Sequence, residues 1–300
     1  MRSTVTTFNF HWRTGGILLI AGVAWLVSSV APATAQSLNW EGQTGVFITP
    51  LAYTAASPKT NLGIPILGFH FLNAGDVLGS FYTTSATVGL LGRAEFGYTR
   101  VFHQDGSTPS LSSLWNGGFN IVHGKVNVLP ENLGKHNWVP ALSAGFVARS
   151  QVPYVAGVLA NGTNTNADFY LVATKTVTQT KHVPLVLNLG YKATNASVFG
   201  LAGNAPAYRG RLFGAAAFVV KAPGKGQLIF GSEFAQQPRD VKDLPGAIVP
   251  TTITYAARFV PSEHTKFNID FGVAQAAGEI LPGVDLHARH QFALGISYGL

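Results

Sequence analysis

One short motif in this 300-residue chain resembles a catalytic element. Gly295-Ile-Ser297-Tyr-Gly299 matches the G-x-S-x-G nucleophile elbow, in which a serine lies at a turn from a strand into a helix. The same motif needs an acid and a histidine later in the chain, but only three residues follow Ser297. We therefore expect that Ser297 is not a nucleophile.

Other residues with suitable side chains lack a supporting spacing. His287 and His290 could supply two metal ligands, but no third ligand accompanies them, which is a weak pattern for zinc. Ser143, His123 and Asp270 could form a serine–histidine–acid site if all three face a shared interior. The absence of cysteine excludes thiolate chemistry. We predict no catalytic residue, no metal site and no cofactor, with the serine–histidine–acid set kept as a third alternative.

Composition and the N-terminal sequence indicate a folded, exported protein. Charged residues make up 11% of the chain and hydrophobic residues 47%, a balance that excludes a disordered chain. An apolar stretch at residues 17–30 is shorter than the roughly 20 residues that span a bilayer, and Ala33 and Ala35 suit cleavage directly after it. We predict a signal peptide at 1–35 and an N-terminal segment at 36–62. The basic residues are scattered, so nucleic acid is not an expected partner.

From residue 63 to residue 300 the sequence alternates between apolar and polar residues, the pattern of strands with two different faces. In residues 266–273 the apolar face carries Phe267, Ile269, Phe271 and Val273. The alternation predicts twelve strands, at about 64–74, 79–91, 93–103, 117–128, 137–149, 167–178, 184–195, 208–221, 226–236, 250–260, 265–275 and 289–300. If residues 40–49 join the sheet with a partner, the count becomes fourteen.

Short and long connections alternate between these strands. Compact links at 91–93, 129–136, 179–183, 222–225 and 261–264 separate longer polar stretches, with an exception at 75–78. Outer-membrane barrels have short turns at one rim and long loops at the other. The last eleven residues also alternate and end on an apolar residue, as final strands of such barrels do. The predicted fold is therefore all-β, a transmembrane antiparallel β-barrel of about twelve strands.

Alternation also predicts which charges face the barrel interior. Two interpretations remain: salt-bridged networks that fill a narrow interior, or charges that line a water-filled, weakly selective pore. We favour the filled interior because a twelve-stranded barrel is modest in width and the signs nearly balance. Arg258 and Asp270 form the expected cross-strand pair, with Lys266 as the rival partner. The residues predicted to face the lumen are Arg93, Glu95, Lys125, Arg149, Lys192, Glu233, Arg258 and Asp270.

Several blocks of the chain resemble a known family, the exopolysaccharide-associated outer-membrane β-barrels and neighbouring uncharacterised barrels of Gram-negative bacteria. Thr44–Pro50 looks like the first strand-to-turn element of that family. The similarity covers about half of the chain after the signal peptide and carries no catalytic residue over. The other similar blocks are Gly118-Phe-Asn-Ile, His123-Gly-Lys125 through Pro130-Glu131, Val139-Pro140 through Gly145, Asp168 through Lys175, and Leu187-Asn-Leu-Gly190-Tyr191.

The sequence thus predicts a Gram-negative outer-membrane β-barrel with a porin-like or envelope-structural role. The resemblance implies a link to polysaccharide export or surface attachment. Expected partners are outer-membrane lipid and the barrel-assembly machinery, with polysaccharide or small solutes as candidate ligands. The alternative is a secreted or periplasmic soluble β-protein that binds a ligand.

Overall fold

A computed structural model describes residues 37–107, 113–152, 165–177, 183–222, 226–240, 246–262, 266–275, 278–285 and 287–300. The chain divides into two units, Met1–Pro32 and Ala33–Leu300. The predicted signal peptide at 1–35 lies outside the described residues, so the following account concerns the second unit.

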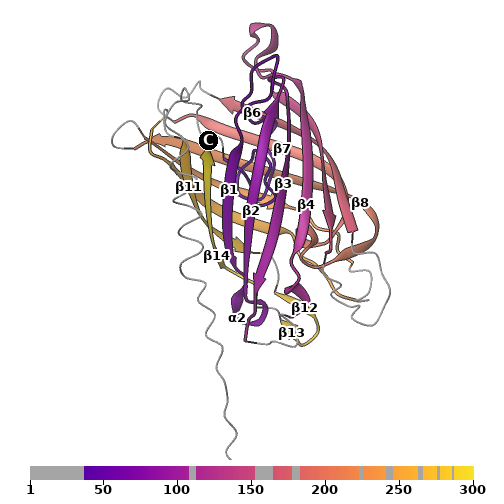
Figure 1. Cartoon of the computed structure of the whole chain (residues 1–300). Helices are drawn as coiled ribbons and strands as arrows, with labels where there is room; N and C mark the ends of the chain where they lie inside the picture. Colours follow the sequence, from indigo (N-terminus) through magenta and orange to yellow (C-terminus); the bar gives the residue numbers. More distant parts are fainter. Residues whose placement is uncertain are drawn as a thin grey trace, which may run out of the picture. The chain divides into compact units, whose positions relative to one another are not determined.

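Twelve antiparallel strands close into one barrel (Figure 1). Each strand pairs with its neighbours in sequence, and β1 closes the sheet against β14. The barrel strands are β1 (Ile66–Asn73), β2 (Ser80–Leu90), β3 (Ala94–Gln104), β4 (Phe119–Leu129), β5 (Ala141–Ser150), β6 (Thr165–Val177), β7 (Leu185–Ala196), β8 (Asn204–Lys221), β9 (Gln227–Ala235), β10 (Thr252–Val260), β11 (Phe267–Gln275) and β14 (Gln291–Gly299).

The predicted all-β barrel of twelve strands is confirmed, and the alternative of fourteen is wrong. Residues 40–49 take part only in isolated bridges, Leu38 with Thr44 and Gly45 with Pro50, because this segment lies inside the barrel. For the same reason Thr44–Pro50 is not a strand of the sheet. Two further short strands, β12 (Glu279–Leu281) and β13 (Val284–Asp285), pair only with each other.

In the described ranges, helices are few and short. The link at 75–78 forms one helical turn, α2 (Gly75–Leu78), and 3-10 turns occur at η1 (Ser113–Trp115), η2 (Leu133–Lys135) and η3 (Val198–Gly200). Within the described residues, no helix combines the length and the apolar character needed to cross a bilayer.

The connections sort onto two ends of the barrel. Because consecutive strands are antiparallel, those that follow β2, β4, β6, β8 and β10 share one end, here called the short-turn rim. The chain end returns to this rim, where the Leu300 amide donates to the carbonyl of Pro65 at 3.1 Å. The opposite end, the long-loop rim, carries α2 and the β12–β13 hairpin (Figure 1). The predicted alternation of connection lengths therefore maps onto two rims.

Glycines on the inner wall make room for flat-lying aromatic rings. Gly145 pairs in register with Tyr170, and Gly190 pairs with Phe213. A Cβ atom would lie 2.3 Å from the Tyr170 hydroxyl at the first glycine and 2.0 Å from the Phe213 ring at the second. Each ring thus lies across a cross-strand glycine, close to the wall. This leaves the middle of the barrel to other residues.

Gly190→Ala should destabilise the barrel by about 1–3 kcal/mol, because the added methyl group overpacks against the buried Phe213 ring. Urea unfolding of the protein refolded in lipid vesicles measures the change. Gly299→Ala is the control, since its Cβ would meet its nearest atom at 3.8 Å, an ordinary contact. Equal stability of the two variants would contradict the close packing of Phe213 on Gly190.

Candidate functional site

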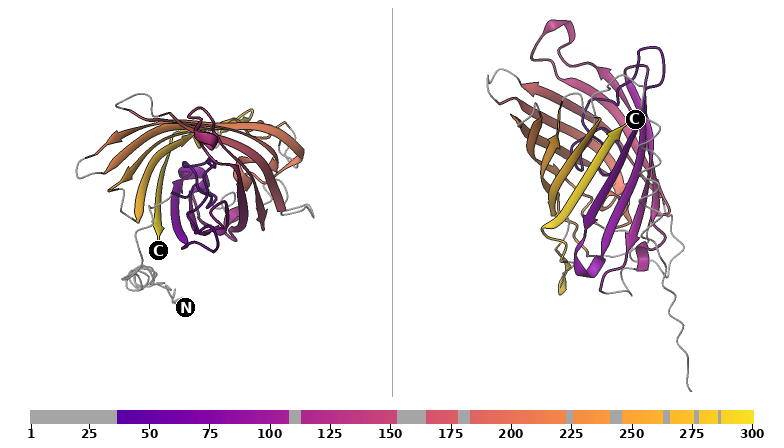
Figure 2. Two further views of the ribbon diagram at one scale, coloured as in Figure 1. Left: turned by 90° about the horizontal axis from the view of Figure 1, so that it is seen from above. Right: turned by 60° about the vertical axis from the view of Figure 1, so that its left-hand side comes forward.

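Residues 37–56, here called the plug segment, lie inside the ring of strands (Figure 2). Leu38, Trp40 and Phe47 are buried in the interior, and the last two belong to the same apolar cluster as residues of the wall. The segment folds back on itself at Asn39, whose side-chain oxygen accepts hydrogen bonds from the amides of Glu41 and Gln43 at 3.1 and 2.9 Å. This polar turn is formed by neighbouring residues, whereas the other hydrogen-bond partners of the plug segment come from strands around the whole barrel.

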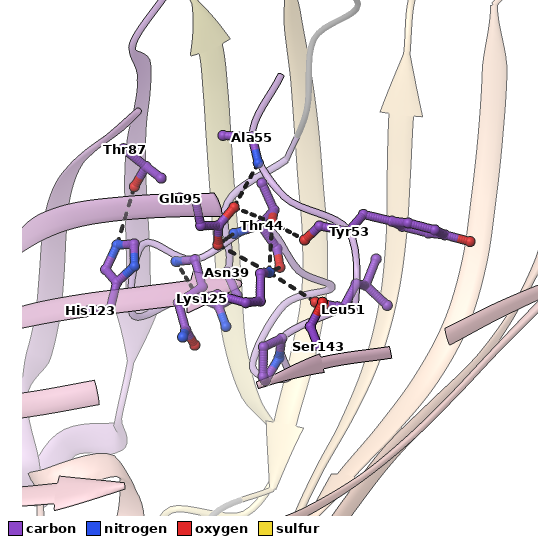
Figure 3. A network of polar contacts seen from close by, with 12 residues as sticks. Asn39, Thr44, Leu51, Tyr53, Ala55, Thr87, Glu95, His123, Lys125 and Ser143 are labelled. Carbon is purple, nitrogen blue, oxygen red and sulfur yellow. Dashed lines mark hydrogen bonds and ion pairs between the residues drawn. The ribbon is translucent and has the colours of Figure 1, made fainter. Parts of the chain in front are cut away.

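Glu95 of β3 and Lys125 of β4 form the first anchor of the plug segment (Figure 3). Glu95 accepts from the Thr44 amide at 3.0 Å, the Thr44 hydroxyl at 2.6 Å and the Ala55 amide at 2.7 Å. The Lys125 ammonium lies 3.0 Å from the Glu95 carboxylate and donates to the carbonyls of Thr44 and Leu51 at 2.9 and 2.8 Å. The ion pair therefore binds backbone donors and acceptors of the plug segment at once.

Glu233 of β9 is the second anchor. Its carboxylate accepts from three consecutive amides, those of Phe47, Ile48 and Thr49, at 2.9, 3.0 and 2.8 Å. It also accepts from the Thr49 hydroxyl at 2.7 Å. Consecutive amides that converge on one anion form a nest, in which backbone dipoles compensate a buried negative charge.

A buried cluster of charges forms the third anchor. The Arg149 guanidinium donates from Nε to Glu41 of the plug segment at 2.8 Å and contacts Asp168 at 3.0 Å. Lys192 lies 3.2 Å from the same Asp168, with its ammonium 5.0 Å from the centre of the Phe199 ring. Arg149 of β5, paired with Asp168 of β6 beside Lys192 of β7, thus binds one carboxylate of the plug segment.

Arg258 of β10 and Asp270 of β11 form the fourth anchor. The two residues pair in register, with Nε 2.6 Å from the carboxylate, so the predicted cross-strand pair is confirmed. Arg258 also donates to the carbonyls of Gly45 and Val46, each at 3.1 Å. Asp270 accepts from the Ser37 hydroxyl at 3.0 Å.

Seven of the eight residues predicted to face the lumen lie at these four anchors. Arg93 does not, because β2 ends at Leu90 and β3 begins at Ala94, so the arginine falls in the exposed turn between them. The charges also do more than pair across strands, since most of their hydrogen bonds go to the plug segment. The seven are Glu95, Lys125, Arg149, Lys192, Glu233, Arg258 and Asp270.

Ser143, His123 and Asp270 are not brought together. The Ser143 hydroxyl donates to the carbonyl of Ala52 at 2.5 Å, and His123 contacts Thr87 at 3.2 Å. Asp270 is engaged by Arg258 and by the plug segment. This arrangement offers no nucleophile–base–acid relay among the three.

The plug segment itself was missed by sequence reasoning. A signal for it exists in hindsight, since residues 37–56 combine low charge and small polar residues with buried aromatics such as Trp40 and Phe47, and lack the period of a strand. A small cavity of about 20 Å³ lies between Thr49, Tyr170 and Lys192. That volume holds about one water molecule. The plug segment therefore occupies the lumen between the four anchors.

Glu233→Gln should speed hydrogen exchange at the amides of Phe47, Ile48 and Thr49 by roughly 10- to 100-fold. The glutamine side chain lacks the negative charge to which these three backbone amides donate. A hydrogen bond to a charged group contributes about 1.5–3 kcal/mol. Hydrogen–deuterium exchange measured by mass spectrometry reads this segment directly. Glu279→Gln in the β12–β13 hairpin is the matched control and should leave the exchange unchanged. Unaltered exchange in Glu233→Gln would mean that the nest does not hold the plug segment.

The solved structures that match this chain include two outer-membrane porins and an outer-membrane channel. The KdgM porin shares 11% identity with a TM-score of 0.45, and the match covers 79% of this chain and 99% of that one. The NanC porin shares 8% identity with a TM-score of 0.44, over 79% of this chain and 100% of that one. The COG4313 outer membrane channel from Pseudomonas putida F1 shares 13% identity with a TM-score of 0.41, over 84% and 98%.

In sequence, no curated protein matches this chain. A family model does, over residues 34–259, which include the plug segment and the strands from β1 to all but the end of β10. This agrees with the resemblance to uncharacterised outer-membrane barrels. The chain belongs to the family described as "Protein of unknown function (DUF3034)".

Proposed function

We propose that this protein is a porin-like β-barrel of the Gram-negative outer membrane that is closed by its own N-terminal segment. The observation that carries the proposal is the outer surface. Large apolar side chains are exposed on every barrel strand except β2, most strongly at residues such as Phe169 (57%), Leu171 (64%) and Tyr255 (60%). The charges at the anchors lie on the opposite face. An apolar outside and a charged inside suit a bilayer, which offers no partners to polar groups.

The geometry of the sheet supports the same proposal. A membrane-spanning strand needs roughly 9–11 residues, and the barrel strands contain 8 to 18. The closed sheet has no free edge, which a bilayer would leave without hydrogen bonds. In this proposal the short-turn rim faces the periplasm. Outer-membrane lipid and the barrel-assembly machinery are then its partners.

The mobility of the plug segment distinguishes a transport role for such a barrel from an envelope-structural role. A porin-like role requires the segment to move, because it occupies the lumen and is bound there at four anchors. Export of a polysaccharide would require it to leave the lumen altogether. An envelope-structural role follows if the four anchors never release it.

The rival functions fit the structure less well. A soluble ligand-binding β-protein would have to keep some two dozen large apolar side chains in water, far more than the apolar patches of ordinary soluble proteins. An enzyme would need a convergent set of reactive groups, and Ser143, His123 and Asp270 have separate partners.

Leu171→Arg tests residence in the membrane. Leu171 is the central residue of β6 and points outward, so the charged variant should lose about 2–4 kcal/mol of folding free energy in lipid. Wild-type protein should fractionate with outer membranes and migrate differently on gels before and after heating, and the variant should do so poorly. Leu171→Phe is the control. Wild-type protein released in soluble form by osmotic shock would contradict the proposal.

Arg258→Ala tests the closed lumen. Loss of the guanidinium frees the carbonyls of Gly45 and Val46 and unpairs Asp270, so the plug segment should open more often. In planar bilayers the wild-type barrel should pass little current, and the variant should show openings. Arg93→Ala, which removes an exposed arginine of a turn, should behave like wild type. Large, steady openings of the wild-type protein would overturn the closed-barrel proposal.

A further inference from the structure

A surface pocket lies at the short-turn rim, outside the lumen. Its volume is about 630 Å³, and its lining includes Glu131, Asn132, Asn137, Trp138, Lys175 and Val177. Trp138 is 76% exposed, whereas Trp40 and Trp115 are 2% and 5% exposed. Apart from a hydrogen bond from the Tyr53 hydroxyl of the plug segment to Glu131, the site in the lumen does not involve these residues, so the pocket requires its own explanation.

The pocket holds an ion pair that is already well defined. The Lys175 ammonium lies 2.8 Å from the Glu131 carboxylate and also donates to the Asn132 side chain at 2.8 Å. An ammonium has three hydrogens, so these two contacts leave one N–H direction for a further acceptor. Glu131 also accepts from the Thr176 amide at 2.7 Å and from the Tyr53 hydroxyl at 2.8 Å.

Glu131 is ionised in this setting. Partial burial raises the pKa of its carboxyl, but the hydrogen bonds from Lys175, Thr176 and Tyr53 outweigh this and hold the pKa below its usual value. The pocket therefore presents one negative and one positive group side by side, with no net charge.

The position of the pocket places it at the edge of the apolar outer surface. Lys175 and Val177 continue the outward-facing positions of Phe169 and Leu171 along β6. Trp138 precedes β5 by three residues, and Leu142 at the start of that strand is 40% exposed. A tryptophan at such an edge suits the interface between hydrocarbon and headgroups.

We propose that this pocket binds the headgroup of a zwitterionic phospholipid with a primary amine, the ethanolamine class. Lys175 donates its remaining N–H to the phosphate, and the lipid ammonium donates to Glu131 and the Asn137 side chain. The indole of Trp138 packs along the glycerol and the first acyl carbons. The inference rests on the proposed membrane residence.

The charge pattern selects among lipid classes. A headgroup that carries only a negative charge brings no ammonium of its own to pair with the Glu131 carboxylate, so its phosphate is repelled by that carboxylate. A choline headgroup has no N–H to donate, so it loses the hydrogen bonds to Glu131 and Asn137. The pocket should therefore favour ethanolamine over both choline and glycerol headgroups.

Short-chain phospholipids titrated into the full protein in detergent test the site. Because the other two described tryptophans are buried, a change in intrinsic fluorescence that is absent in Trp138→Phe reports on the pocket. The ethanolamine lipid should give a saturable change at a concentration at least tenfold lower than the choline and glycerol lipids. Lys175→Gln and, separately, Glu131→Gln should abolish this preference. Lys221→Gln, at an exposed lysine that ends β8 on the same rim, should retain it.

The outcomes separate the two proposals. Flotation with lipid vesicles tests membrane residence, and its failure removes both the proposed function and the lipid site. If the protein floats but responds equally to the three headgroups, Trp138 is only an interfacial anchor and the lipid site is wrong. If Lys175→Gln no longer migrates differently on gels before and after heating, that variant has not folded, and Glu131→Gln decides the result. A preference for the ethanolamine lipid that Glu131→Gln retains overturns the proposal.

Discussion

The interior of this barrel depends on one requirement, that every buried backbone donor and acceptor of the plug segment finds a partner. A chain that crosses the lumen without joining the sheet satisfies only part of its own amides and carbonyls, as in the hydrogen bond from the Trp40 amide to the Phe47 carbonyl. Side chains of the wall supply further partners, and the charged ones bind the most backbone groups each. Glu95 and Glu233 accept from the amides of Thr44, Ala55 and residues 47–49, while Lys125 and Arg258 donate to carbonyls. These contacts fix the path of the segment through the lumen.

Burial of so many charges is costly unless each is compensated. The wall supplies four carboxylates and four cations in contact with the plug segment or with one another, and the segment adds Glu41. Ion pairs account for all of the wall groups except Glu233, which the nest of amides compensates. Removing one of these side chains therefore leaves a buried charge or a set of buried backbone groups without a partner, so more than a single contact is lost. The wall members are Glu95, Lys125, Arg149, Asp168, Lys192, Glu233, Arg258 and Asp270.

The plug segment and the short-turn rim are physically continuous. The hydroxyl of Tyr53 lies between Glu131 and Thr176, so the segment leaves the lumen in contact with the rim pocket. Beyond it the chain follows β2, where Leu62 bridges to Leu90 before β1 begins. A displacement of the plug segment would therefore break a hydrogen bond at the rim as well as those in the lumen.

The sequence by itself determined the number of strands, the ends of most of them and the facing of several, and it named Arg258–Asp270 as the expected pair with Lys266 as the rival. These features follow from a period of two and from turns a few residues long, which are local properties. Only the tertiary structure decided what fills the lumen. Phe47 and Glu233 are 186 residues apart, and Ser37 and Asp270 are 233 apart, so no local pattern connects them. An aperiodic segment gains its conformation from the surface that surrounds it, and that surface exists only once the barrel has closed.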